Sequence, residues 1–262
     1  MKIAICFYGI TRSLPHTIAS IERNILAPCR NLGEVRVFAH FFQQDRVENK
    51  RSRENVALNL DDYKLLNADV VELEQPDLCL ESYDFEALKR FGDARRDGFM
   101  SLRNLIHALH SMKRATRLAQ EWSPDVVLVV RPDLEYHESL GPYVQAAMER
   151  ADDHIVIPDW QHWRGGLNDR FAICKGTAAT DAYAMRGELI TAYCTHFKEP
   201  LHPESLVRFA LERSNISVDY MPVRATRIRA DGRAKNEHFE PSRVDAIKTG
   251  LRNIRRRLRG VR

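Results

Sequence analysis

Several familiar sequence signals are missing from this chain of 262 residues. Its five cysteines are odd in number, widely scattered and without a C-x-x-C pair, which argues against a disulfide framework and against a zinc knuckle. No uncharged run approaches the roughly 20 apolar residues of a membrane span. The apolar run at the start is shorter than a signal-peptide core and reads better as a strand. We therefore expect a protein of the reducing cytoplasm.

Two nucleotide-binding motifs are also absent. The chain contains neither G-x-G-x-x-G nor G-x-x-x-x-G-K-[ST], so dinucleotide binding of the Rossmann type and P-loop binding lose most of their support. The net charge of +4 is modest, and seven basic residues without an acid lie in residues 248–262. This basic end lacks interleaved aromatics and any nucleic-acid-binding motif, so no nucleic-acid partner is expected.

The hydrophobic pattern predicts an α/β fold in a single domain, because 44% hydrophobic content in 262 residues suits one sizeable core. Residues 2–8, 13–24 and 35–40 read as strand, helix and strand, which predicts parallel pairing with a right-handed crossover. Residues 101–122 form the clearest amphipathic helix, and residues 44–64 read as a surface loop or short helices over the site. Further strands are expected at 69–73, 155–158, 171–174 and 216–223, and further helices at 180–197 and 203–214.

The most informative segment is residues 124–136, where an uncharged Val/Leu run ends at Arg131-Pro132 and is followed by Asp133 and Glu135. Such a run predicts a strand covered on both faces, and the carboxyl ends of strands are where α/β sheets bind ligands. In an extended chain the two carboxylates point to the same side and can hold a hard divalent cation. The alternative is a solvated turn after the strand.

Two other segments carry polar groups in suggestive positions. Tyr8-Gly-Ile-Thr-Arg-Ser13 places a glycine, the two aliphatic hydroxyls of Thr11 and Ser13 and a cation at a helix start, which suits an anion or, equally, a turn in which Ser13 caps the helix. Residues 160–170 combine two Trp, a His and a Gly-Gly pair with Asn-Asp-Arg, which suits a sugar ring and its hydroxyls. Alternatively, the Trp side chains cap the core.

Six blocks of sequence occur in an order that resembles a bacterial family of small glycosyltransferases from surface-polysaccharide loci, and the strand followed by Asp-x-Glu resembles the metal and nucleotide-sugar motif of the GT-A fold. The similarity spans roughly residues 1–240 and lies in the order of the blocks. These blocks are residues 1–12, 109–115, 129–135, 168–172, 203–206 and 228–232. The resemblance implies a GT-A-like, Rossmann-like, mostly parallel sheet flanked by helices, with a catalytic domain at residues 1–245 and a basic tail at 246–262.

The resemblance also implies residue roles at the nucleotide. It places Gly9 and Arg12 near the nucleotide, and Asp133 at its diphosphate or metal, with Arg131 in the same block as a further binding residue. A divalent cation, Mn²⁺ or Mg²⁺, is the implied cofactor. Its expected ligands are Asp133, Glu135 and the late His238. Because Glu135 stands where a strict Asp-x-Asp motif has its second Asp, metal dependence stays open.

At the sugar, the resemblance places Asp169 and Arg170 near the donor and Glu204 near the acceptor. Asp169 and then Glu204 are the candidates for the base that deprotonates the acceptor hydroxyl, although an acid in the first turn of a helix also complements the helix dipole. The implied activity is transfer, of hexosyltransferase type, from a nucleotide sugar to a polysaccharide or lipid-linked saccharide in bacterial surface-glycan synthesis. The alternatives are a non-catalytic sugar-binding relative and a nucleic-acid-binding protein that uses the tail.

The basic tail suggests a second partner. Leu251, Ile254 and Leu258 recur at three- and four-residue steps among arginines, so a helix there would present a narrow apolar stripe with a cationic surround. Such a helix suits the anionic inner face of a membrane, where a lipid-linked acceptor resides. A solvated tail is the alternative. The expected location is thus the cytoplasm, with peripheral attachment to the membrane through residues 248–262.

Overall fold

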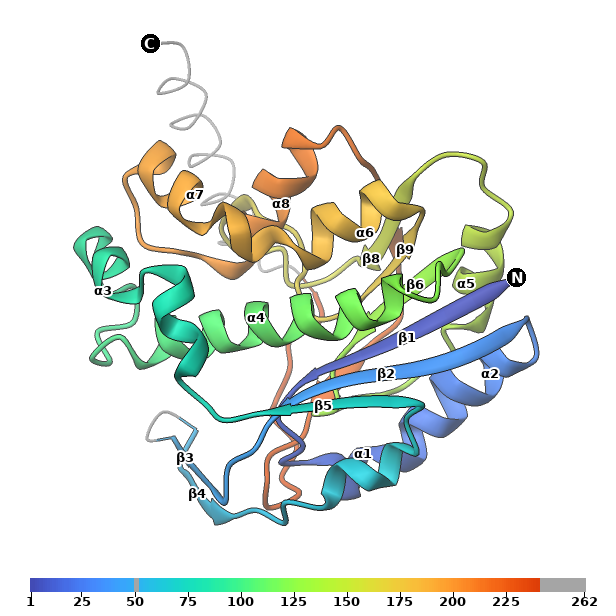
Figure 1. Ribbon diagram of the computed structural model, residues 1–262, viewed down its shortest axis with the longest axis horizontal. Helices are drawn as coiled ribbons and strands as arrows, with labels where there is room; N and C mark the ends of the chain where they lie inside the picture. The colour runs from blue at the N-terminus through green and yellow to red at the C-terminus, as the bar shows by residue number, and fades with distance from the viewer. Residues whose placement is uncertain (50–51, 241–262) are drawn as a thin grey trace.

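The structure of the chain is a computed structural model that describes residues 1–49 and 52–240 (Figure 1). The predicted tail at 246–262 lies outside the described residues. The strands are β1 Lys2–Gly9, β2 Glu34–Phe42, β3 Arg46–Asn49, β4 Glu54–Ala57, β5 Val70–Glu74, β6 Val126–Val130, β7 Leu134–Tyr136, β8 His154–Pro158, β9 Ala172–Lys175, β10 Ser217–Met221 and β11 Ala225–Arg227. The α-helices are α1 Leu14–Ile21, α2 Ala27–Arg30, α3 Phe85–Leu88, α4 Met100–Gln120, α5 Gly141–Met148, α6 Thr177–Ala184, α7 Ile190–Phe197 and α8 Pro203–Arg213.

Short helical turns connect several of these elements. A π-helical turn, Glu22–Leu26, joins α1 to α2. The 3₁₀ turns are η2 Asp62–Leu66, η3 Leu78–Tyr83, η4 Lys89–Phe91, η5 Trp163–Gly165 and η6 Arg186–Leu189. None of the helices in the described ranges combines the length and the apolar character that crossing a bilayer requires.

The centre of the described part is a seven-stranded sheet of order β10-β8-β9-β6-β1-β2-β5. β1 pairs in parallel with both β2 and β6, β2 with β5, and β10 with β8, whereas β9 is antiparallel to its two neighbours. The sheet is therefore mostly parallel and flanked by helices (Figure 1), which confirms the predicted fold class. The parallel pairing predicted for the first β-α-β unit is also confirmed.

Alternating side chains of the central strands supply two cores, one on each face of the sheet. Ala4, Cys6 and Tyr8 of β1 face the core shared with α4, α6, α7 and α8. Ile3, Ile5 and Phe7 face the core shared with α1 and α5. All five residues of β6 are buried. This burial on both faces is the reason that β6 is a continuous apolar run, as the sequence predicts.

Other predicted elements differ from those observed. The helix expected at 180–197 is broken by η6 into α6 and α7. The expected loop at 44–64 contains an antiparallel hairpin, β3 and β4, before η2. The long helix predicted at 101–122 is confirmed as α4, with Ile106, Leu109, Met112 and Ala115 buried.

Strand direction brings distant segments to one edge of the sheet. β1, β2, β5 and β6 end at this edge because they run in parallel. The antiparallel β9 begins there, since Ala172 pairs with Val129 at the end of β6. After β6 the chain continues into β7, which pairs with the late strand β11. The turn after β1, the segment after β6 and the loop before β9 therefore converge.

Candidate functional site

Asp133 lies directly after β6 and is surrounded by guanidinium groups. Arg131 donates from Nε to Oδ1 at 2.8 Å and from Nη2 to Oδ2 at 2.9 Å. Arg12, in the turn after β1, donates from Nη2 to Oδ2 at 2.9 Å, and Nε of Arg227 lies 3.7 Å from Oδ2. The side chain of Asp133 is only 4% exposed. The carboxylate therefore lies beneath the arginines rather than facing solvent.

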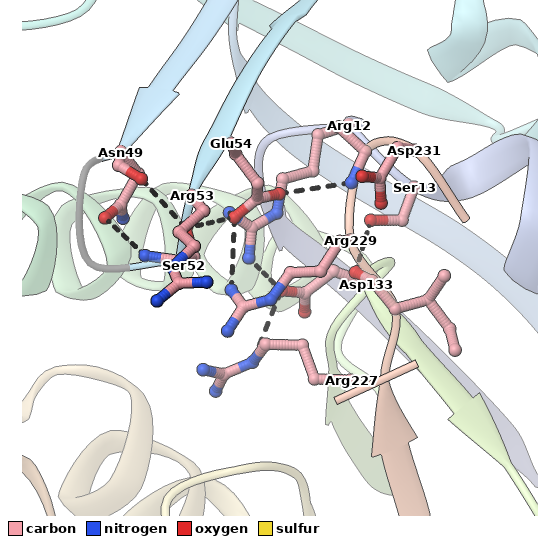
Figure 2. A network of polar contacts seen from close by, with 12 residues as sticks. Arg12, Ser13, Asn49, Ser52, Arg53, Glu54, Asp133, Arg227, Arg229 and Asp231 are labelled. Carbon is pink, nitrogen blue, oxygen red and sulfur yellow. Dashed lines mark hydrogen bonds and ion pairs between the residues drawn. The ribbon is translucent and has the colours of Figure 1, made fainter. Parts of the chain in front are cut away.

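Glu54 forms a second buried acid beside the same arginines (Figure 2). Its Oε2 accepts from Nη1 of Arg12 at 3.4 Å and from Nη1 of Arg229 at 3.2 Å, and it also contacts the hydroxyl of Ser52. Oε1 accepts from the backbone N–H of Ala230 at 3.1 Å. Glu54 begins β4, so the β3–β4 hairpin is joined to the site by this carboxylate.

We call this group the arginine cluster. Its charged side chains are Arg12, Arg131, Arg227, Arg229, Asp133 and Glu54. Its four guanidiniums outnumber its two carboxylates, so the cluster carries two positive charges in excess. Nε of Arg12 and Nε of Arg227 are buried without a hydrogen-bond partner in the described part of the chain. These two atoms are enclosed by protein, so it is the excess positive charge of the cluster that suits an anionic ligand.

The charges of the cluster stabilise one another. Burial by itself raises the pKa of Asp133, but the adjacent guanidiniums of Arg131 and Arg12 bring it well below the ordinary value for an aspartate. Burial lowers the pKa of Arg131, and the carboxylate of Asp133 more than reverses that effect. Asp133 is thus ionised at neutral pH and serves as a fixed counter-ion.

The turn after β1 differs from the sequence reading in which Ser13 caps the helix. Gly9 has a φ of 110°, a conformation that favours glycine, and its N–H donates to Oγ of Ser111 at 2.8 Å. This N–H is therefore already paired within the fold. Ser13 precedes α1, but its hydroxyl makes no capping bond and donates to the carbonyl oxygen of Ile228 at 2.6 Å. The contribution of this turn to an anion site is the side chain of Arg12.

The loop before β9 is largely part of the core. Trp160 is 1% exposed, and its Nε1 donates to the carbonyl oxygen of Val223 at 2.8 Å. Asn168 is also buried and donates to the carbonyl oxygen of Trp160 at 2.6 Å. The expectation that Trp160 offers a face to a sugar is therefore wrong, because its ring is enclosed. Trp163 is the half-buried tryptophan of this loop.

Asp169 and Arg170 follow this buried frame at the sheet edge. Arg170 donates from its backbone N–H to Oδ1 of Asn168 at 2.8 Å and from Nη2 to Oε1 of Gln161 at 3.1 Å. Both Asp169 and Arg170 are half-buried. The charge of Asp169 acts on both Arg131 and Glu204, so the predicted residues after β6, before β9 and at the start of α8 share one electrostatic environment.

Glu204 lies in the first turn of α8 and is 5% exposed. Its Oε2 lies 3.4 Å from Nδ1 of His202, and its backbone oxygen accepts from the N–H of Leu167 at 2.8 Å. A side chain on Gly166 would overlap the backbone of Glu204, so glycine permits this close approach of the loop to the helix. Burial, followed by the charge of Asp169, raises the pKa of Glu204 to about 8.

The predicted metal ligands are not assembled into one site. Asp133 is buried with its oxygens bound by guanidiniums, whereas Glu135 is exposed on β7 and His238 is exposed in the late loop. Over the described ranges, the group of at least three suitable ligand atoms lying within 4.8 Å of one another consists of His40, Glu74 and His110. In this arrangement Asp133, Glu135 and His238 do not fit a divalent cation.

A small pocket lies at the carboxyl ends of β1 and β2. Its lining includes Ile10 and Thr11 from the turn that also carries Arg12, together with Phe42 at the end of β2 and Tyr63 in η2. Its cavity volume of about 10 Å³ is no more than one water molecule needs, so this pocket does not hold a nucleoside in the present conformation.

Sequence reasoning missed three members of the cluster: Glu54, Arg227 and Arg229. The two arginines come from a late segment because β11 pairs with β7 and the N–H of Ile228 donates to the carbonyl oxygen of Asp133 at 2.9 Å. The alternation Arg227-Ile228-Arg229 is a weak strand signal, which would place both arginines on the same face of a strand. Glu54 had no signal beyond its place in a polar stretch.

The sequence matches no protein-family model and no curated protein. Among solved structures, the chain is similar to mouse xyloside xylosyltransferase 1 in its apo form, at 9% identity and a TM-score of 0.44, over 84% of this chain and 85% of that chain. It is also similar to a Bacillus anthracis protein designated a glucose-1-phosphate thymidylyltransferase, solved with sucrose, at 9% identity and a TM-score of 0.38, over 96% and 95%. At these values the similarity does not indicate a reaction.

Proposed function

We propose that this chain is a glycosyltransferase that uses a nucleotide-sugar donor and a saccharide acceptor, either a polysaccharide or a lipid-linked saccharide of the bacterial surface. The observation that carries the proposal is the arginine cluster, with its excess positive charge, beside the acid pair Asp169 and Glu204. A diphosphate matches the first feature, and proton removal from a hydroxyl matches the second.

In the proposed reaction the acceptor oxygen attacks the anomeric carbon of the donor sugar. The new bond forms between these two atoms as the bond from the anomeric carbon to the diphosphate oxygen breaks, and the nucleoside diphosphate leaves with the electron pair. The guanidiniums of Arg12, Arg227 and Arg229 stabilise the charge that develops on this leaving group. The carboxylate of Glu204 takes the proton of the acceptor hydroxyl, and burial, together with the charge of Asp169, raises its pKa for that role.

Arginines supply the neutralising charge in this proposal, so nucleotide binding is expected without added Mn²⁺ or Mg²⁺. UDP, GDP and CMP, and their sugars, would be screened for an increase in the melting temperature of the full chain, since a ligand of the native state raises stability by mass action. If nucleotide binding requires added Mn²⁺ or Mg²⁺, the proposal that arginines neutralise the diphosphate is contradicted. Stabilisation without consumption of any sugar nucleotide, across a panel of saccharide acceptors, would instead indicate a non-catalytic sugar-binding protein.

Substitutions in the arginine cluster test whether the nucleoside diphosphate binds there. Arg227→Gln and Arg229→Gln are each expected to weaken nucleoside diphosphate binding at least about tenfold, because hydrogen bonds to charged groups contribute about 1.5 kcal/mol or more. Arg150→Gln is the matched control, since Arg150 pairs with Asp152 and Asp219 at the opposite edge of the sheet. Equal loss of affinity in all three variants would place the diphosphate elsewhere.

A further inference from the structure

A second cluster of ligating side chains lies beside the proposed nucleotide site and is separate from it. His40 belongs to β2, Glu74 ends β5, and His110 lies in the middle of α4. Oε2 of Glu74 is 3.1 Å from Nε2 of His40 and 2.9 Å from Nε2 of His110. Three elements that are distant in sequence therefore direct two imidazole nitrogens at one carboxylate oxygen.

The contacts of Ser111 determine which nitrogen of His40 carries its proton. The Ser111 hydroxyl accepts from the N–H of Gly9 at 2.8 Å and donates to the carbonyl oxygen of His40 at 2.7 Å. A hydroxyl has one proton to donate, so the 2.9 Å contact between Nδ1 of His40 and the same oxygen is donated by His40. Nδ1 of His40 is thus the protonated nitrogen in this network.

This tautomer leaves the other nitrogen of His40 without a proton. In a neutral ring with a proton on Nδ1, Nε2 presents a lone pair, and here that lone pair faces an oxygen of Glu74. Two acceptors in contact repel each other unless a cation lies between them. Metal-bound histidines characteristically donate their second nitrogen to a nearby oxygen, as His40 does to Ser111.

We infer that His40, Glu74 and His110 form a binding site for a divalent first-row metal ion of the zinc type, which ties β2, β5 and α4 together at the carboxyl edge of the sheet. Two imidazole nitrogens and one carboxylate oxygen are a ligand set that zinc accepts, and a water molecule would complete a tetrahedron.

Two of the three separations between the ligand atoms are close to those of a tetrahedral site. The three ligand atoms lie within 4.8 Å of one another. Metal–ligand distances of about 2.0 to 2.1 Å place tetrahedral ligand atoms about 3.3 to 3.4 Å apart. The two observed separations from Glu74, 3.1 and 2.9 Å, need only a few tenths of an ångström of adjustment. His40 is fully buried, and the side chains of Glu74 and His110 are 20% and 15% exposed, so the ion has a path from solvent.

A neighbouring acid does not complete the site. Oε1 of Glu72 is 3.9 Å from Nε2 of His40, but Arg114 donates to the same oxygen from Nε at 3.0 Å and from Nη2 at 2.5 Å. The Arg114 guanidinium competes with a metal for that oxygen. The site therefore has three protein ligands and one position for water. It also supports the proposed nucleotide site, because the imidazole of His40 holds the hydroxyl that fixes the N–H of Gly9.

The test uses the full chain without a histidine tag, after chelator treatment and dialysis. Titration with Zn²⁺ should show one tight equivalent and an increase in melting temperature. His110→Ala and Glu74→Gln should each weaken Zn²⁺ binding by about 10- to 100-fold or more and abolish the thermal shift. His107→Ala is the matched control, because His107 lies one turn earlier in α4 and pairs with Asp77; it should bind Zn²⁺ as the unsubstituted chain does.

A spectroscopic measurement on the unsubstituted chain keeps the inference open to refutation if a variant does not fold. Co²⁺ in place of Zn²⁺ should give the strong visible absorption of a four-coordinate site and should be displaced by one equivalent of Zn²⁺. Absence of this spectrum, or equal Zn²⁺ affinity in His110→Ala, Glu74→Gln and His107→Ala, would overturn the inference. Because no nucleotide or sugar is present, the outcome does not depend on the proposed function.

Discussion

Arg131 and Asp133, separated by a single proline, form a two-point ion pair in which Nε and Nη2 of the arginine each donate to a different carboxylate oxygen. The carboxylate is 4% exposed and the Arg131 side chain 21% exposed, and Arg12 adds a third donor to the same carboxylate. Such a pair is costly to break from one side, because the remaining partner stays buried without its counter-charge. The acid of the Asp-x-Glu motif is therefore part of the internal structure of the site.

The first prediction concerns the stability of Asp133→Ala. A carboxylate after a strand end suggests, from sequence alone, a solvent-facing group that can be removed without loss of fold. With the ion pairs in view, we expect Asp133→Ala to lower the free energy of unfolding by about 3 to 5 kcal/mol, measured by chemical denaturation. Glu135→Ala is the matched control, since Glu135 is exposed, and should change stability by less than about 0.5 kcal/mol. Equal stability of the two variants would contradict the prediction.

The second prediction concerns the pH dependence of stability. The pKa of Glu204 is raised in the folded chain to about 8, so the fold favours the protonated acid. This contribution is complete below the ordinary pKa of a glutamate and is lost as the pH rises toward 8. Between pH 5 and pH 8 the free energy of unfolding should therefore fall in the unsubstituted chain by about a few kcal/mol more than it falls in Glu204→Gln. Glu212→Gln, at the exposed end of α8, should retain the slope of the unsubstituted chain.

The third prediction concerns the rate. If the ionised form of Glu204 accepts the proton, kcat/KM should rise with pH and level off above about 8. Because the charge of Asp169 contributes to the raised pKa, Asp169→Asn should move this rise to lower pH while leaving nucleoside diphosphate affinity nearly unchanged. The measurement is a pH–rate profile of both proteins with the donor found in the binding screen. If the pH–rate profile of Asp169→Asn does not shift, the charge of Asp169 does not influence the pKa of the catalytic base.

The fourth prediction concerns the glycine that brings the two acids together. The Cβ of Gly166→Ala would overlap the backbone of Glu204 and Ser205, so the loop and the start of α8 must separate. We expect a loss of about 1 to 3 kcal/mol in stability and a larger loss in turnover than in nucleotide affinity. The arginine cluster is the internal control, since the atoms nearest to the added Cβ belong to Glu204 and Ser205. Unchanged turnover would mean that this close approach is not needed for activity.

The sequence predicts the framework of the fold well, because local patterns carry that information. The run at Val126–Val130 is apolar because both faces of β6 are covered. The apolar residues of α4 recur at three- and four-residue steps because one face of this helix is buried. Breaks inside regular patterns are harder to predict. The split between α6 and α7 depends on how Arg186 packs against Tyr183 and Met112, which no local rule contains.

The site is predicted less completely, since its members meet only through tertiary pairing. Arg12, Arg131 and Asp133 are recognisable because they follow the ends of adjacent parallel strands. Arg227 and Arg229 reach the site through the antiparallel pairing of β11 with β7. The cluster of His40, Glu74 and His110 depends on the register that places α4 over β2 and β5. A single sequence does not reveal such contacts.

The last prediction separates stability from binding at Glu54. This buried acid pairs with Arg12 and Arg229 and accepts from the N–H of Ala230. Glu54→Gln should destabilise the chain, because both guanidiniums lose a counter-charge in a buried place. It should also raise the affinity for a nucleoside diphosphate, because one negative charge leaves the arginine cluster.

The two effects should have opposite signs in the same variant, which few unspecific perturbations produce. About 1 kcal/mol of relieved repulsion, the Coulomb energy of two charges about 4 Å apart in water, corresponds to roughly fivefold tighter binding. Calorimetric titration with the best nucleotide, paired with chemical denaturation, measures both. Arg229→Gln is the complementary variant, and its affinity should fall. If Glu54→Gln and Arg229→Gln both weaken binding, then Glu54 acts by holding the arginines in position rather than by its charge, and the excess positive charge of the cluster does not set the affinity.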